Sequence, residues 1–150
     1  MEKDTTFIDR VVEAFLECEE EPYKVLYTYG SPEQTGKLAE KVCREYRARH
    51  PEAVIFREDG TYFNMRLIQG IKCGHNPARM AFADYDLLVF ENIEGISGRQ
   101  TSEEIVYLML DRTILRGKKV LVTGNVPAIQ QVSLAPRICA HLSGGIHLAV

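Results

Sequence analysis

The chain lacks the features that mark membrane, secreted and disulfide-rich proteins. No apolar run approaches the roughly 18 residues that a membrane-spanning helix needs, and the amino terminus, MEKDTTFIDR, is too polar for a signal peptide. The four cysteines include no C-x-x-C pair, which argues against a zinc site and a disulfide framework. We therefore expect a cytoplasmic protein without membrane association, in which the following thiols are buried and reduced: Cys18, Cys43, Cys73 and Cys139.

An excess of basic residues is also missing. Lysine and arginine total 18 against 21 acidic residues, and the net charge of −3 argues against a dedicated surface for duplex DNA. With 150 residues, 45% apolar content and no repeat or low-complexity tract, residues 1–150 should form one domain with a sizeable core. The histidines show no ligand spacing, so we assign no metal to protein side chains alone: His50, His75, His141 and His147.

The stretch from Asp84 to Glu104, DYDLLVFENIEGISGRQTSEE, is the most informative part of the sequence. Its apolar run LLVF is typical of a central parallel strand buried on both faces, and the run ends directly in Glu91 and Asn92. Ligands bind at the carboxyl edge of open α/β sheets, and in nucleotide hydrolases a carboxylate there holds Mg²⁺. The segment indicates either such a site or a core strand followed by a polar loop.

A second segment, KVLYTYGSPEQTGK, has the context of a phosphate-binding (Walker A) loop. An apolar strand is followed by a Gly/Ser/Pro turn, and Gly36 and Lys37 open a helical pattern. The spelling of the motif G-x-x-x-x-G-K-[ST] is damaged, however. Gly30 lies one residue too early, Ser31 stands where the first glycine belongs, and Leu38 replaces the hydroxyl that would bind Mg²⁺.

Two further residues of this loop oppose nucleotide binding. Pro32 removes one backbone donor from the cradle. Glu33 places a negative charge where triphosphate oxygens would lie, a repulsion of roughly 3 kcal/mol at a distance of about 5 Å. We therefore expect ATP or ADP with Mg²⁺ to bind weakly, if at all, and we assign no cofactor with certainty.

Apolar runs and helical patterns alternate along the rest of the chain. This alternation predicts an α/β fold, a three-layer α/β/α sandwich with a five-strand parallel sheet like that of P-loop NTPases. The expected strands are Val25–Tyr29, Val54–Glu58, Leu87–Glu91, Lys119–Thr123 and Ile146–Val150. The expected helices are Phe7–Glu19, Gly36–Arg49, Thr61–Ile71 and Ser102–Arg116.

These segments resemble the AAA+ nucleotide-binding core of the bacterial replication initiator DnaA. The resemblance runs from about Tyr23 to Val150 and rests on VLYTYG with GK, the central block DYDLLVFENIEGISGRQTSEE, VLVTGNVP and LAPRICAHLSGGIHLAV. The central block is the most specific, because it matches the family in its strand, in the isoleucine that follows and in its G-[KR]-x-T-x-E-E helix start. The resemblance implies the AAA+ strand order, in which we expect the strand ending at Glu91 to lie beside the strand ending near Gly30.

The resemblance also implies site residues, several of which depart from the family pattern. The Mg²⁺-organising aspartate (Walker B) falls at Glu91, and the second acidic residue falls at Asn92, whose amide cannot accept a proton from an attacking water. The sensor residue falls at Asn125, which could instead serve only the turn before Pro127. ATP hydrolysis is therefore in doubt.

The family's subunit-contact motif falls in LAPRICAHL. Arg137 keeps the first of the arginines that reach a neighbouring subunit's nucleotide, unless it only caps a helix or pairs with a local carboxylate. The arginine-finger position falls at His141, which lacks the guanidinium fork. We find no counterpart of the family's lid or of its helix-turn-helix domain, so we expect no autonomous sequence-specific DNA binding.

Two functions fit these residues. The first is a non-catalytic accessory or regulator of replication initiation with degenerate Walker motifs, acting through contacts with an initiator or with its own copy; Glu33, Leu38 and Asn92 favour it. The second is a functional ATP-binding initiator or helicase-loader-like ATPase domain, which Gly36, Lys37 and Glu91 keep open. An unrelated role on the same fold also remains, because a fold does not fix a function.

Overall fold

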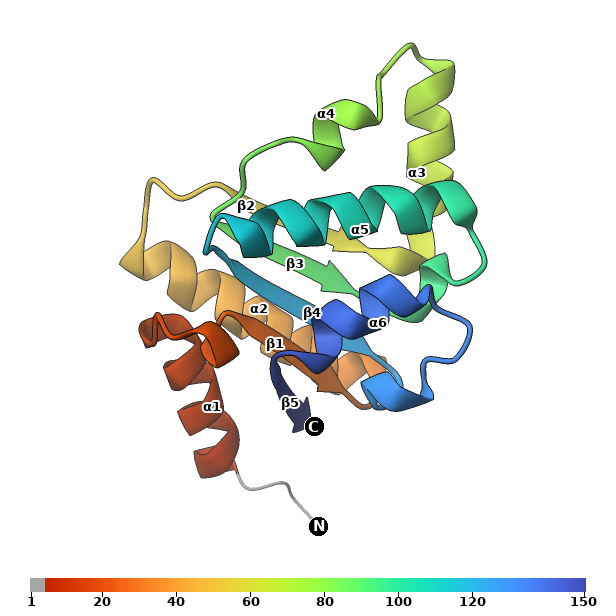
Figure 1. Cartoon of the computed structure of the whole chain (residues 1–150). Helices are drawn as coiled ribbons and strands as arrows, with labels where there is room; N and C mark the ends of the chain where they lie inside the picture. The colour runs from red at the N-terminus through yellow and green to blue at the C-terminus, as the bar shows by residue number, and fades with distance from the viewer. Residues whose placement is uncertain (1–4) are drawn as a thin grey trace.

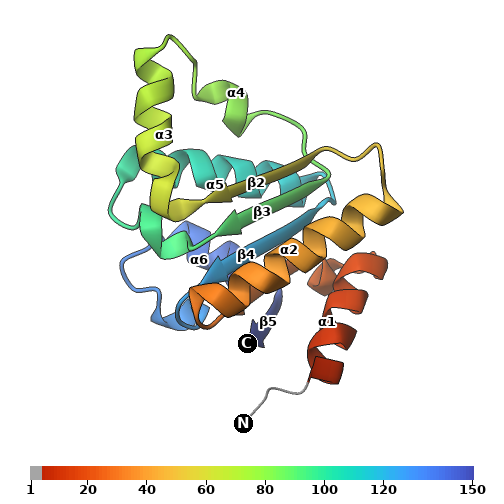
Figure 2. The same ribbon diagram turned by 180° about the vertical axis from the view of Figure 1, so that it is seen from behind.

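The computed structural model describes residues 5–150 and contains one five-stranded sheet between two layers of helices (Figures 1 and 2). All paired strands are parallel, and their order across the sheet is β2-β3-β4-β1-β5. The predicted three-layer α/β/α architecture is therefore confirmed. The strands are β1 (Val25–Tyr29), β2 (Ile55–Asp59), β3 (Leu87–Glu91), β4 (Lys119–Gly124) and β5 (Ile146–Ala149).

Helices connect the strands, and short 3₁₀ turns follow α1, β3 and β4. Two helices, α4 and α6, were not predicted. The helices are α1 (Thr5–Glu17), α2 (Pro32–Arg49), α3 (Gly60–Lys72), α4 (Ala78–Ala81), α5 (Gln100–Leu115) and α6 (Pro136–Ser143), and the 3₁₀ turns are η1 (Glu21–Tyr23), η2 (Ile93–Ile96) and η3 (Ala128–Gln130). Within residues 5–150 we find no helix with the length and apolarity needed to cross a membrane.

The expected contact between β3 and β1 is wrong, because β4 lies between these strands. Val120 of β4 is in register with Leu88 of β3 on one side and with Val25 of β1 on the other. The chain leaves β3, crosses through α5 and returns beside β3 as β4. Strands that end at the same edge need not be neighbours, and motif positions at that edge do not determine their lateral order.

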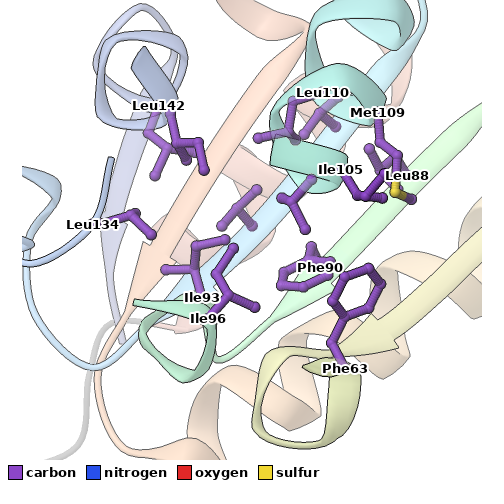
Figure 3. Packing of buried hydrophobic residues seen from close by; sticks show 14 of the residues in the cluster. Phe63, Leu88, Phe90, Ile93, Ile96, Ile105, Met109, Leu110, Leu134 and Leu142 are labelled. Carbon is purple, nitrogen blue, oxygen red and sulfur yellow. The ribbon is translucent and has the colours of Figure 1, made fainter. Parts of the chain in front are cut away.

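The alternation of side chains along the strands divides the core into two layers. Leu87 and Val89 of β3 point toward α1 and α2, whereas Leu88 and Phe90 point toward α3, α5 and α6. Figure 3 shows the second layer, in which the rings of Phe63 and Phe90 meet edge to face with their centroids 5.3 Å apart. A strand covered on both faces accounts for the continuous apolar run LLVF.

Helix α2 begins at Pro32, about one turn before the expected start at Gly36. Ser31 is the N-cap, and its Oγ accepts a hydrogen bond from the Gln34 N–H at 3.3 Å. Proline at the first helical position and an acidic residue, Glu33, in the first turn favour the same start. Strand β1 is therefore joined to α2 by two residues, and the turn expected to form a loop is helical.

All four cysteines are free, and three of them are partly buried. The expectation of buried thiols is wrong for Cys73, which is exposed at the end of α3. Helices α3 and α4 rise above the rest of the molecule in both views (Figures 1 and 2), which explains why the end of α3 meets solvent.

Candidate functional site at the carboxyl edge of the sheet

The carboxyl ends of β1, β3 and β4 bring most of the expected site residues to one edge of the sheet. Gly30 and Ser31 follow β1, Glu91 ends β3, and Asn125 follows β4. Gly36 of α2 faces Glu91, because a Cβ built on Gly36 would lie 4.0 Å from the Glu91 Oε1. A nucleotide site of this fold would lie at this edge.

Few backbone donors at the start of α2 are free to bind phosphate. Pro32 has no N–H, the Gln34 N–H bonds to the Ser31 Oγ, and the Thr35 N–H bonds to the Ser31 carbonyl at 3.0 Å. This leaves the N–H groups of Ser31 and Glu33, and the Glu33 side chain is itself an anion. The first turn of α2 therefore does not present the cradle of N–H groups that a triphosphate needs.

The other residues of the damaged loop motif are placed elsewhere. The Lys37 side chain is 68% exposed, and its Nζ lies 3.4 Å from a Glu33 carboxylate oxygen one turn away. Leu38 is 6% exposed and packs in the core between α2 and α1. At Gly30 a Cβ would lie 2.3 Å from the Val150 carbonyl oxygen, so the end of the chain closes against this turn. Of Lys37, Leu38 and Gly30, Lys37 is the residue whose side chain can meet a phosphate.

Glu91, the residue at the Walker B position, is held by an arginine from the neighbouring strand. The Arg57 Nε and Nη2 donate to the two Glu91 carboxylate oxygens at 2.8 and 3.4 Å, and Nη1 donates to Glu40 on α2 at 2.5 Å. The bond to Glu91 is the main cause that raises the pKa of Arg57, and the bond from Arg57 lowers the pKa of Glu40. A cation already neutralises the carboxylate that would have to hold Mg²⁺.

Asn92 forms hydrogen bonds that hold the neighbouring segments together. It adopts a left-handed conformation with φ of 52°, its N–H donates to the Thr123 Oγ1 at 2.9 Å, and its Nδ2 donates to the Asp59 Oδ1 at 3.0 Å. Asp59 in turn caps α3 by accepting the Thr61 N–H at 2.9 Å. A Cβ on Gly60 would lie 2.3 Å from the Asn92 carbonyl oxygen, which shows how closely these segments approach.

Hydrogen bonds to neighbouring segments hold the loop after β4 in place. The Asn125 N–H donates to the Glu94 Oε1 at 2.8 Å, while the residue itself is exposed. Glu94 also accepts from the Gln131 Nε2 at 3.3 Å, and the Tyr27 hydroxyl donates to the Val126 carbonyl at 2.5 Å. Burial raises the pKa of Tyr27. The sensor-like position is therefore held through its backbone.

Arg137 and His141 lie on α6 and face α5. The Arg137 guanidinium carbon lies 4.3 Å from the centroid of the Tyr107 ring, and the His141 ring stacks on the same tyrosine with centroids 5.4 Å apart. The His141 Nε2 is 3.2 Å from an Asp111 carboxylate oxygen, although the contact lacks hydrogen-bond geometry. Both residues at the subunit-contact positions thus have partners within the chain.

No family model matches the sequence. The chain is similar to the chromosomal replication initiator protein DnaA of Sphingopyxis alaskensis, with 24% identity over 118 residues, 78% of this chain and 26% of that protein. It is also similar to a structure of the replication initiator DnaA bound to AMPPCP and single-stranded DNA, with a TM-score of 0.85 and 18% identity over all of this chain and 47% of that one. The chain has a DnaA-like AAA+ core.

This DnaA-like core also shares its fold with a helicase loader. The structure of the DnaC helicase loader matches all of this chain and 93% of its own length, with a TM-score of 0.77 and 15% identity. The chain spans about a quarter of the length of the curated initiator, so the activity of a whole initiator does not transfer to it.

The DnaA-like core brings only part of the expected site residues together. Gly30, Ser31, Gly36 and Glu91 meet at the edge of the sheet, whereas Lys37 points to solvent and Leu38 to the core. Among residues 5–150 no group of three or more His, Cys, Asp or Glu side chains could hold a metal ion. Sequence reasoning missed Arg57, because its contact with Glu91 depends on the pairing of β2 with β3, which no local pattern in the sequence indicates.

Proposed function

We propose that this chain is a DnaA-like AAA+ protein that does not turn over ATP and that regulates or assists replication initiation through protein contacts in the cytoplasm. The observation that carries the proposal is the start of α2 at Pro32, which leaves two residues where a phosphate loop would lie. Arg57 on Glu91 and the bonding of Asn92 to Asp59 support it. We expect no phosphate release above background.

Exposed apolar side chains support a role in protein contacts. Ile129 and Val132, in the loop after β4, are each 87% exposed. Tyr62, Met65 and Ile68 are about half exposed on the face of α3 opposite to buried Phe63. Contiguous apolar patches on a surface mark contacts with other proteins, and we infer that these side chains contribute to such contacts. The similarity to initiator and loader structures suggests a replication initiator, or a second copy of the chain, as the partner.

Substitution of Arg137 tests whether α6 contacts the partner protein. Arg137→Ala should weaken a complex with a full-length initiator while leaving the thermal stability of the isolated chain nearly intact, because an exposed cation–π contact contributes only about 0.5–1 kcal/mol. A pull-down and a light-scattering series would measure the complex. Arg44→Ala, an exposed arginine on α2, is the matched control and should leave binding unchanged.

Two results would count against this proposal. A chain that stays monomeric and binds no initiator at micromolar concentrations would remove the docking role. Equal losses for Arg137→Ala and Arg44→Ala would show a general effect of charge rather than a contact at α6.

A functional ATP-binding domain is the second candidate, and the exposure of Lys37 favours it. Lys37 is held only by an exposed pair with Glu33, so it is free to reach a phosphate if the first turn of α2 unwinds. Loss of nucleotide binding in Lys37→Ala would support this candidate over the first.

A further inference from the structure

The guanidinium of Arg57 joins three elements at the carboxyl edge of the sheet. Arg57 lies on β2, where it is in register with Val89 of β3, and its fork reaches forward to Glu91 at the end of β3. Its remaining arm binds Glu40 on α2. One side chain therefore connects β2, β3 and α2 at the point where the family places Mg²⁺.

The burial of Glu91 makes a cation necessary at this point. The Glu91 side chain is only 14% exposed, and a carboxylate withdrawn from water is costly unless it is paired and hydrogen-bonded. Arg57 supplies the charge, a short hydrogen bond from Nε at 2.8 Å and a longer one from Nη2 at 3.4 Å. Glu40, which is mostly exposed, brings a second carboxylate to the same cation.

We propose that Arg57 is a resident cation that takes the place of a divalent metal at this edge. The two carboxylates that it bridges are oxygen donors of the kind that Mg²⁺ uses, and a metal would have to displace the guanidinium to reach them. The edge of the sheet is thereby complete without metal or nucleotide. This inference rests on the proposed nucleotide-independent function. It is tested by the thermal stability of variants, which is measured without nucleotide.

Removing Arg57 should leave Glu91 uncompensated and open the pair of carboxylates to an added cation. Thermal unfolding of Arg57→Ala should show a midpoint about 5–10 °C below that of the wild type. Addition of about 10 mM MgCl₂ should raise the midpoint of the variant by several degrees and that of the wild type by less than about one degree. NaCl at the same ionic strength separates this effect from screening.

Arg49 provides a matched control on the far end of α2. It also bridges two carboxylates, Glu13 and Glu17, and its side chain is 30% exposed against 34% for Arg57. Both of its partners are more than half exposed. Arg49→Ala should therefore cost less stability and gain no response to MgCl₂.

A double variant keeps the inference testable if Arg57→Ala does not fold. Arg57→Ala with Glu91→Gln removes the uncompensated charge as well as the arginine, so it should fold and recover most of the lost midpoint. A double variant no more stable than the single one would contradict the inference, as would a wild-type midpoint in Arg57→Ala or an equal MgCl₂ response in Arg49→Ala. Tight ATP binding by the wild type would contradict the proposed function instead, and these stability comparisons would still stand.

Discussion

Asp86 holds the start of β2 to the start of β3. Its Oδ2 accepts the Val54 N–H at 2.8 Å, and the Lys118 Nζ lies 3.3 Å from its Oδ1. The bond from Val54, followed by that from Lys118, lowers the pKa of Asp86 below its ordinary value. Because the folded pKa is the lower one, the charge stabilises the fold above the unfolded pKa of about 4, and this contribution is lost as the pH falls through the folded pKa.

Asp86→Asn should therefore lower the free energy of unfolding at pH 7 by about 1 kcal/mol, and the difference from the wild type should shrink as the pH falls below about 4. Urea unfolding at a series of pH values measures both quantities. Glu52→Gln, an exposed carboxyl near the same strand ends, should leave the curve unchanged. A difference that persists undiminished at pH 2 would show that the charge of Asp86 is not its cause.

The first turn of α2 occupies the segment in which a phosphate loop would otherwise lie. Ser31 caps the helix, and Gly36 lies in its interior with room for a methyl group, since the nearest atom to an added Cβ would be the Glu91 Oε1 at 4.0 Å. Ser31→Ala should lower the free energy of unfolding by about 1 kcal/mol through loss of the cap. Gly36→Ala should raise it by about 0.5–1 kcal/mol, because alanine favours a helix interior.

Chemical unfolding of the two variants measures these opposite changes in the free energy of unfolding. Gly30→Ala is a useful contrast, because its Cβ would meet the Val150 carbonyl at 2.3 Å and its φ is positive, so it should be destabilising. A destabilising Gly36→Ala would indicate that Gly36 belongs to a loop rather than to α2.

The elements themselves were largely predictable, and the exceptions have physical causes. Short apolar runs predicted the strands because a sheet covered on both faces buries nearly all residues of its central strands. The expected start of α2 at Gly36 is wrong because Gly36 and Lys37 match the end of a phosphate-loop motif, whereas Ser31 and Pro32 form an ordinary cap and first residue of a helix. Arg57 was missed because its partner, Glu91, is set by lateral strand pairing rather than by local pattern.

At the scale of the whole molecule, the fold is that of a DnaA-like AAA+ core in which the residues at the carboxyl edge of the sheet bond to one another. Arg57 pairs with Glu91, and Asn92 donates a hydrogen bond to Asp59. Glu94 accepts the N–H of Asn125 and so holds the loop after β4. The order of the strands could not be read from the sequence, because it depends on the path of each crossover rather than on any residue. Because these contacts already pair the residues at the edge, we expect the chain to bind a nucleotide weakly.

Calorimetric titration of the wild-type chain with ATP, with and without Mg²⁺, tests this claim most directly. The start of α2 offers a triphosphate few donors and the charge of Glu33, so we predict no saturable heat, or a dissociation constant in the high micromolar range or weaker that Mg²⁺ does not improve. Saturable binding at nanomolar concentrations, strengthened by Mg²⁺ and lost in Lys37→Ala, would contradict the account.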